Sequence, residues 1–346
     1  MSERTTPRIR PPGRWPALRI ESKATRTRAW AWIRGLGGLA VLGLLVWHVG
    51  SGPFVAGLRR VDGSAITIAA VIGALTTLCC AWRWRLVLSG LGVKLPWRDA
   101  VTAYYRSLFL NATLPGGVVG DAHRAVRHGM DIGDVGLGVR AVVLERVAGL
   151  SVQVFLAVAV LWLFPSPARS FLPTVTVVVL ATALAAVLVG RALPRLRRAL
   201  SAVRGDVRAG LFTGRTWLGV LAASSGVVLG SLATFLLAAR TAGAVAPLLQ
   251  LVPLTMLALL AMGLPVNVAG WGAREGAAAW AFGAAGLTAA QGVATAVTYG
   301  VLVLAASLPG AVVLVARWVS RRLDGNRDGD PVRTPAPALQ GDGVRG

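Results

Sequence analysis

The sequence is poor in charge, in cysteine and in histidine. Charged residues make up 14% of its 346 residues, against roughly 25% in ordinary globular chains. A water-soluble surface over such a length needs more charge, so a chain of several soluble domains is disfavoured. The only two cysteines, Cys79 and Cys80, are neighbours, and the three histidines are scattered. Because neither set supplies a disulfide framework or a metal site, we expect no metal and no cofactor.

Recognisable catalytic and nucleotide-binding motifs are also missing. The sequence contains no Gly-x-x-x-x-Gly-Lys-Ser/Thr loop, no His-Glu-x-x-His pair and no Gly-x-Ser-x-Gly elbow. Its longest polar stretches are the two tails, which are too short for a nucleotide-binding domain. We therefore expect no catalytic residues and no enzymatic activity, and any ATP-driven step would need a partner.

Arginine and long apolar runs are what the sequence has in excess. Lys and Arg number 36 against 14 Asp and Glu, for a formal net charge of +22, and 55% of residues are hydrophobic. The arginines lie between the apolar runs and not along one face, which argues against a nucleic-acid partner. They fit instead the retention of basic loops in the cytoplasm and the attraction of arginine to anionic lipid headgroups.

The apolar runs predict an all-α, polytopic membrane bundle of about seven or eight spans, because about 20 apolar residues cross the hydrocarbon layer as a helix. The predicted spans are 30–49, 64–82, 136–164, 171–190, 216–239, 247–263 and 289–316. Basic loops at 83–98 and 191–215 fall on the side of both tails, so we place both termini in the cytoplasm and the chain in the inner membrane. This requires an even number of crossings, which residues 274–286 would complete as a short, broken one.

The chain divides into one membrane domain and two tails. Residues 1–28 read as a flexible basic cytoplasmic tail, and no clean cleavage site follows the first apolar run. Residues 29–317 form the transmembrane domain, with possible halves at 97–146 and 247–296. Residues 318–346, rich in Asp, Gly and Pro, are expected to be a disordered cytoplasmic tail.

Two apolar segments are interrupted by residues that break helices. In the first, residues 97–110 are half-polar and are expected to lie along the membrane face. The breakers that follow are Pro115, Gly116, Gly117 and Gly120. The second segment, residues 264–277, contains Pro265, Asn267, Gly270 and Gly272. Irregular backbone at membrane depth is tolerated only under cover of protein or beside a wet cavity, so we expect two re-entrant or broken-helix segments.

The two interrupted segments share a spacing. Arg124 follows Pro115 by nine positions, Arg274 follows Pro265 by nine positions, and the two segments are displaced by 150 throughout. Paired interruptions in corresponding halves point to a transporter binding site. The alternative is a chance match among common residues, and the sequence leaves open whether the halves are parallel or inverted.

Charged residues stand within or beside these apolar segments, and six are candidates for a site: Asp121, Arg124, Glu145, Arg146, Arg274 and Glu275. Charges inside a bilayer usually face the bundle interior and have partners. In a structural interpretation, Glu145 only neutralises Arg140, Arg146 or Arg274. In a functional one, Arg124 and Arg274 hold a phosphate through parallel hydrogen bonds, and an acid balances their charge or holds a cationic headgroup.

Three longer motifs contain these residues. They are Leu114-Pro-Gly-Gly-Val-Val-Gly-Asp121 followed by Arg124, then Glu145-Arg146-Val-Ala-Gly149, then Leu264-Pro-Val-Asn-Val-Ala-Gly-Trp-Gly-Ala-Arg-Glu-Gly276. In this order, over roughly residues 30–320, they resemble the lysylphosphatidylglycerol synthase transmembrane (flippase-like) family. In that family the membrane domain of the multiple peptide resistance factor is implicated in moving aminoacylated phosphatidylglycerol between leaflets.

The resemblance implies a lipid-handling membrane domain in which two re-entrant segments meet at a central cavity lined by the six charged residues. The sequence departs from the family pattern at Val266-Asn267, where a small hydroxyl residue would be expected. It also lacks the cytosolic aminoacyl-transferase domain of the full synthase, so we do not expect it to make the lipid itself.

We therefore expect a lipid flippase or transporter that binds a phosphate-bearing headgroup between its halves. The cargo would be an anionic phospholipid or a polyprenyl-phosphate-linked lipid. Two alternatives stay open. The chain could be the membrane subunit of a system that modifies glycosyl- or aminoacyl-lipids, with a separately encoded enzyme. It could also be a structural or regulatory subunit whose basic loops recruit partners.

Overall fold

The computed structural model describes residues 43–44, 46–48, 50–114, 117–170, 173, 205–212, 214–263, 267–268 and 271–327. This part of the chain is helical apart from two short strands, β1 (Asn267–Val268) and β2 (Trp271–Gly272), which pair antiparallel. The helices are α2 (Gly52–Arg59), α3 (Gly63–Gly90), α4 (Trp97–Thr113), α5 (Val119–Asp131), α6 (Val135–Leu163), α9 (Thr216–Thr241), α10 (Leu248–Met262), α11 (Ala273–Ala284) and α12 (Ala289–Arg327). The all-α prediction is confirmed for the described residues.

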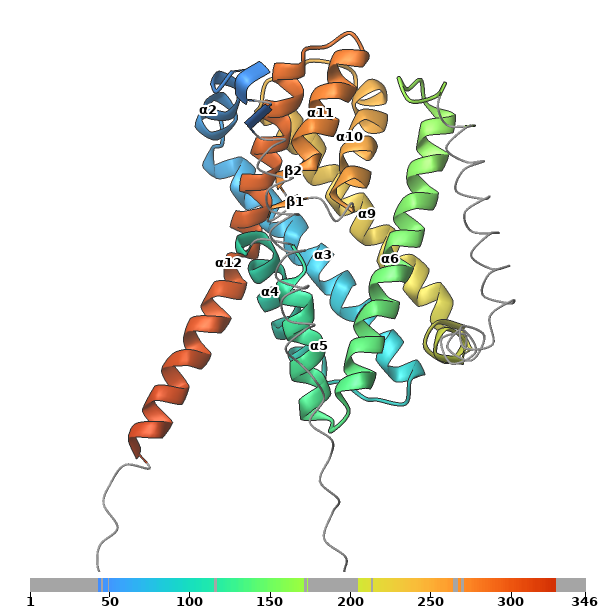
Figure 1. The fold of residues 1–346 in the computed structure, drawn as a ribbon, viewed down its shortest axis with the longest axis vertical. Coiled ribbons are helices and arrows are strands. Elements are labelled where there is room, and N and C mark those ends of the chain that lie inside the picture. Colours follow the sequence, from blue (N-terminus) through green and yellow to red (C-terminus); the bar gives the residue numbers. More distant parts are fainter. Residues whose placement is uncertain are drawn as a thin grey trace, which may run out of the picture.

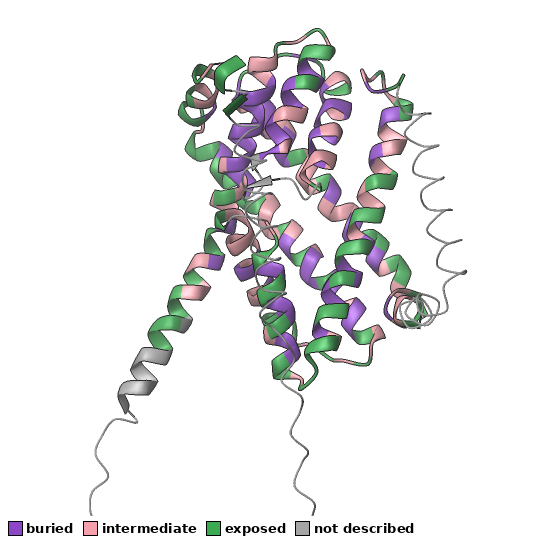
Figure 2. Cartoon of the chain, viewed as in Figure 1, coloured by how far each residue is buried: buried purple, intermediate pink, exposed green. Residues whose placement is uncertain are grey.

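The outer surface of this helical bundle is apolar. Among the described residues, four helices are long and apolar enough to cross a membrane: α3, α6, α9 and the Ala289–Ser320 part of α12. In the most apolar 18-residue stretch of each of these helices, only 22% to 33% is buried. The exposed side chains include many Leu, Val and Trp, and much of the outer surface is exposed (Figure 2). Soluble proteins rarely expose apolar surface on this scale. The surface therefore suits contact with lipid.

Acidic caps fix where two of these apolar helices begin. Asp62 Oδ1 accepts a hydrogen bond from the Ala65 backbone N–H at 2.9 Å at the start of α3. Asp134 Oδ1 accepts one from the Leu137 N–H at 2.9 Å at the start of α6. Such caps satisfy backbone donors that have no partner within the helix. They set the entry points of the two helices that later carry Arg83 and Glu145.

Helices α4 and α5 form the first hairpin, which rises from the lower end of the bundle to mid-height and returns (Figure 1). Gly120 lets the two arms touch, since a Cβ there would lie 2.7 Å from the Ser107 carbonyl carbon. The prediction that residues 97–110 lie along the membrane face is wrong. Helix α4 packs against α3, α5 and α12, and Tyr104, Arg106 and Ser107 are buried.

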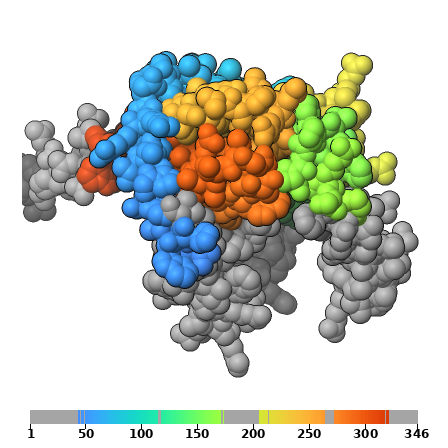
Figure 3. Space-filling view, turned by 90° about the horizontal axis from the view of Figure 1, so that it is seen from above, coloured from blue at the N-terminus to red at the C-terminus, as the bar shows by residue number. Residues whose placement is uncertain are grey.

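Helices α10 and α11, joined through β1 and β2, form the second hairpin. It enters from the upper end, where Gln250 Nε2 donates to the Ala285 carbonyl at 2.9 Å (Figure 1). From above, the orange atoms of this hairpin and of α12 lie between the blue atoms of α2 and α3 and the green atoms of α6 (Figure 3). Helix α10 has 15 residues, which rise about 22 Å and fall short of a ~30 Å hydrocarbon layer. Residues 247–263 and 274–286 were predicted to be separate crossings. In the structure they are the two arms of one hairpin.

The two hairpins enter from opposite ends, and the elements around them repeat with inverted direction (Figure 1). Helix α3 descends, the first hairpin follows and α6 ascends. Helix α9 ascends, the second hairpin follows and α12 descends. The packing repeats as well, because α4 lies against α12 as α10 lies against α6, and α3 packs on α9. The orientation of the halves, which the sequence left open, is inverted.

Several predicted segments lie wholly or mostly outside the described residues. They are the two tails, the predicted spans 30–49 and 171–190, and Pro115, Gly116, Pro265 and Gly270. Within the described part, four helices are long enough to span and two hairpins turn back. The predicted total of seven or eight spans stays a prediction.

Candidate functional site

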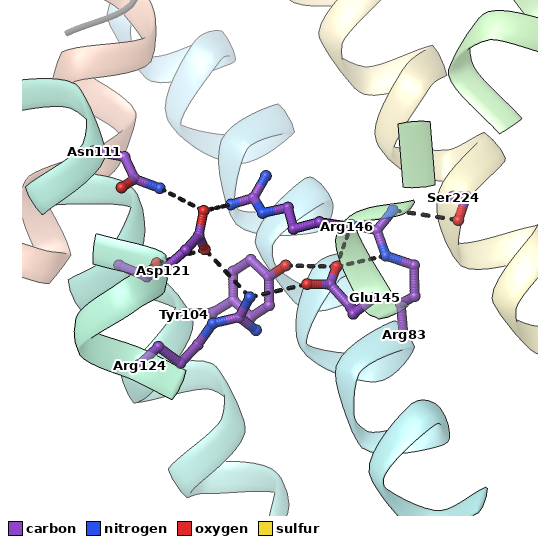
Figure 4. A network of polar contacts seen from close by, with 9 residues as sticks. Arg83, Tyr104, Asn111, Asp121, Arg124, Glu145, Arg146 and Ser224 are labelled. Carbon is purple, nitrogen blue, oxygen red and sulfur yellow. Dashed lines mark hydrogen bonds and ion pairs between the residues drawn. The ribbon is translucent and has the colours of Figure 1, made fainter. Parts of the chain in front are cut away.

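Glu145 lies at the centre of a buried ionic network between neighbouring helices (Figure 4). Its side chain is fully buried on α6. Oε1 accepts hydrogen bonds from Arg83 Nε and from the Tyr104 hydroxyl, both at 2.7 Å, and also pairs with Arg83 Nη2. Oε2 pairs with Arg124 Nη2 at 2.9 Å. One carboxylate thus joins side chains from α3, α4 and α5 to α6.

Asp121, in the first turn of α5, is the second anionic centre of the network. Its Oδ1 accepts a hydrogen bond from Ser107 Oγ at 3.0 Å and pairs with Arg124 Nη2 at 3.2 Å. Its Oδ2 accepts a hydrogen bond from Asn111 Nδ2 at 3.1 Å and pairs with Arg146 Nη2 at 2.6 Å. Arg124 therefore bridges the two carboxylates through a single nitrogen.

The network carries more positive than negative charge. It contains the guanidinium groups of Arg83, Arg124 and Arg146 and the carboxylates of Asp121 and Glu145, so its formal net charge is +1. Buried charge that is not neutralised is costly in a low-dielectric interior. The side chain of Arg146 is 45% exposed, whereas that of Arg124 is 1% exposed. A singly charged anion that reaches Arg146 from outside would neutralise the network.

Arg83 is a member of the network that the sequence analysis missed. The predicted span 64–82 placed Arg83 in a cytoplasmic basic stretch, but α3 continues to Gly90 and buries it. Its Nη1 donates to Ser224 Oγ on α9 at 3.2 Å. The apolar run that follows Arg83, through residues 86–88, is the signal that the helix continues. Tyr104 was missed because α4 was expected to lie outside the bundle.

The predicted partners of Glu145 were mostly wrong. Glu145 pairs with Arg83 and Arg124, and neither was named as its partner. Arg140, which was named, pairs with Asp206 at 3.3 Å on the surface. Four of the six candidate residues do come together as one network, namely Asp121, Arg124, Glu145 and Arg146.

Arg274 and Glu275 form a second buried cluster at the start of α11. Arg274 Nε donates to Glu275 Oε1 at 2.9 Å, and the Gly272 backbone N–H donates to Glu275 Oε2 at 2.6 Å. Gly272 has φ of 108°, a left-handed conformation that glycine adopts without strain. The guanidinium carbon of Arg274 lies 5.2 Å from the centre of the Tyr299 ring. The ion pair of Arg274 and Glu275 has no net formal charge.

Helix α9 contacts both clusters. Ser224 binds Arg83, and Ser231 shares a hydrogen bond with Tyr299, the ring against Arg274. Seven residues are close to two helical turns, so both serines lie on one face of α9, about 10 Å apart along its axis. Arg83 of the first network and Tyr299, the ring against Arg274, therefore contact neighbouring levels of the same helix.

These features define a polytopic α-helical membrane protein with two inverted hairpins and buried ionic clusters at the level of its apolar surface. The chain belongs to the lysylphosphatidylglycerol synthase TM region family, which it matches over residues 32–310. The resemblance seen in the three motifs is thereby confirmed. A search of curated proteins finds no match.

Proposed function

We propose that this protein binds the phosphate-bearing headgroup of a lipid and moves the lipid between the leaflets of the membrane. The observation that supports this most directly is the excess positive charge of the Glu145 network, which opens to the surroundings at Arg146. A phosphodiester headgroup carries the single negative charge that the network needs. Guanidinium groups match phosphate oxygens in geometry and charge.

The inverted hairpins support movement as well as binding. Interrupted elements that reach the membrane midplane from opposite sides are typical of transporters with alternating access. Arg124 and Arg274, one on each hairpin, would serve the two halves of such a path. The family name refers to a phosphatidylglycerol derivative, so an anionic phospholipid is the first cargo to test, and a polyprenyl-phosphate-linked lipid is the second.

The lower end of the bundle is proposed to face the cytoplasm. In the described residues the helix ends and connections at the lower end carry Lys94, Arg98, Arg127, Arg208 and Arg215, whereas those at the upper end carry Arg59, Arg60, Arg169 and Arg240. Basic residues are retained on the cytoplasmic side. With the predicted spans 30–49 and 171–190, the number of crossings would be six, which returns both termini to the cytoplasm of a cell with an inner membrane.

We propose binding and transport in place of catalysis by this chain. Asp121 and Glu145 are each held by two arginines, so neither carboxylate is poised to accept a proton from a substrate. A lipid-modifying step would come from a separately encoded partner.

Mass spectrometry of co-purified lipids tests the binding step. Wild type, Arg124→Ala and Arg274→Ala are compared, with Arg140→Ala as a control because Arg140 lies in an exposed ion pair. We expect one phosphate-bearing lipid class to be enriched with wild type and the control, and lost from the two site variants. The same bulk lipid profile for all four proteins would mean that the arginines only stabilise the fold, as in a structural or regulatory subunit.

A further inference from the structure

Arg124 of the ionic network and two side chains beside it, Trp84 and His128, carry buried nitrogens with no hydrogen-bond partner among the described residues. They are Nε and Nη1 of Arg124, Nε1 of Trp84 and Nε2 of His128. Arg124 and Trp84 are 1% exposed and His128 is 8% exposed. Buried polar groups nearly always have a partner, and each exception calls for an explanation, of which a bound water or ion is one.

Arg124 and His128 both contact the Trp84 ring. The guanidinium carbon of Arg124 lies 4.4 Å from the centre of the Trp84 ring. The His128 ring packs edge-on against the same Trp84 ring, with centroids 5.2 Å apart. Arg124 and His128 are one turn apart on α5, and Trp84 faces them from α3. The unpartnered nitrogens are thus gathered around one indole ring.

The chemistry of these nitrogens selects an acceptor. The indole N–H and the guanidinium N–H groups can only donate, and a histidine nitrogen can donate as well. Both carboxylates of the network contact Arg124 through Nη2 alone, which leaves its other two nitrogens for a ligand. Because Arg124 is cationic and the network has an excess positive charge, an anionic oxygen fits better than a neutral one.

We propose that Trp84, Arg124 and His128 form a phosphate-oxygen subsite between α3 and α5. It rests on the proposed lipid-binding function and adds two residues, Trp84 and His128, that neither the motifs nor the ion pairs assign. Helix α5 descends from its first turn, which carries Asp121, to its last turn, which carries His128 (Figure 1), so His128 lies nearer the lower end of the bundle than Asp121 does. A headgroup arriving from the leaflet at that end would meet His128 before it reaches Asp121.

Binding to detergent-purified full-length protein tests the subsite. The probes are dihexanoyl phosphatidylglycerol, inorganic phosphate and dihexanoylglycerol, which has the same chains and no phosphate. The test variant is Trp84→Phe, which keeps an aromatic ring against Arg124 and removes the N–H. Trp82→Phe is the matched control, because Trp82 lies two residues earlier on α3 with 39% exposure.

We expect Trp84→Phe to weaken phosphatidylglycerol binding about tenfold, as the loss of a hydrogen bond to a charged group predicts, and Trp82→Phe to bind like wild type. Binding of inorganic phosphate as well would show that the subsite takes any phosphate, whereas binding of the lipid alone would show a headgroup site. His128→Phe should give the same loss, which covers the case that Trp84→Phe does not fold.

Unchanged affinity in both Trp84→Phe and His128→Phe would overturn the subsite and leave lipid binding standing. Equal binding of dihexanoylglycerol to wild type would also overturn it, because the phosphate would then make no contribution. If wild type bound none of the probes, the subsite and the proposed function would both fail.

Discussion

Arg83 Nε lies 2.7 Å from Glu145 Oε1, although 62 residues separate the two in the sequence. The same carboxylate also binds Tyr104 and Arg124. Helices α3, α4, α5 and α6 therefore meet at one buried anion. Glu145 therefore helps to hold the first hairpin in place. The same carboxylate offsets the positive charge of the arginines in the candidate site.

Glu145→Gln is expected to destabilise the protein strongly. The substitution leaves Arg83 and Arg124 buried with too little negative charge, and breaking a buried ion pair from one side costs about 3–5 kcal/mol. Thermal unfolding in detergent measures the effect. Asp206→Asn is the control, since it breaks an exposed pair with Arg140 and should cost no more than about 1 kcal/mol. Equal stability of Glu145→Gln and wild type would show that the network does not hold the helices.

Gly149→Ala is expected to impair lipid binding and to lower stability as well. A Cβ at Gly149 would lie 2.8 Å from the guanidinium carbon of Arg83, so the Arg83 side chain would have to shift away from Glu145. The loss of stability should be smaller than in Glu145→Gln, because Arg124 keeps its carboxylate partner.

The check for Gly149→Ala is co-purified lipid together with the melting temperature. Gly63→Ala is the control, because no atom lies within 4 Å of its added Cβ. If Gly149→Ala kept the lipid profile of wild type, the position of Arg83 would not matter for binding.

Gly120→Ala is expected to disrupt the first hairpin. Its Cβ would lie 2.7 Å from the Ser107 carbonyl carbon and 2.8 Å from the Ser107 Cα, and backbone atoms cannot move aside as an arginine side chain can. The yield of monodisperse protein and its melting temperature should both fall, whereas Gly205→Ala, with open space around its Cβ, should behave like wild type. A well-folded Gly120→Ala protein would contradict the close approach of α4 and α5.

Asp62 should give the start of α3 a dependence on pH. Hydrogen bonds from the Ala65 N–H and the Ser64 hydroxyl favour the carboxylate and lower the pKa of Asp62 below its usual value. A lowered pKa in the folded state contributes stability above the unfolded pKa, and this is lost as the pH falls through the folded pKa. Asp62→Asn keeps a capping oxygen and does not titrate.

The melting temperatures of wild type and Asp62→Asn, compared between pH 7 and about pH 3, report this contribution. The advantage of wild type should be present at neutral pH and shrink on acidification. An advantage that grows with acid would mean that the protonated form of Asp62 is the better cap.

The sequence predicted the interrupted segments and much of the first cluster, because helix breakers and charges are conspicuous in apolar runs. Gly117 lies between α4 and α5, and the charges at Asp121 and Glu145 marked buried positions. The direction of the hairpins was not readable, since an apolar run such as residues 247–263 looks the same whether it crosses or turns back. Only the packing of α10 against α6 and α11 shows that it turns back.

Arg83 and Tyr104 were missed for a common reason. Each stands where the polarity of the sequence rises, and rising polarity reads as the end of a span. In the structure both side chains are buried, and both donate hydrogen bonds to the carboxylate of Glu145. A buried carboxylate predicts that donors will be found nearby, but it does not predict from which helix they come.

Lipid translocation in proteoliposomes is the most direct test of the central claim that the network handles a phosphate-bearing headgroup. The protein is reconstituted with fluorescent phosphatidylglycerol, and chemical quenching from outside reports movement between leaflets. Wild type is compared with Arg146→Gln, which removes the exposed cation of the network, and with Arg140→Gln, which removes an exposed arginine on the same helix. We predict movement with wild type and Arg140→Gln, and a loss of about tenfold or more with Arg146→Gln. Movement at the wild-type rate in Arg146→Gln, or none in wild type, would contradict the account.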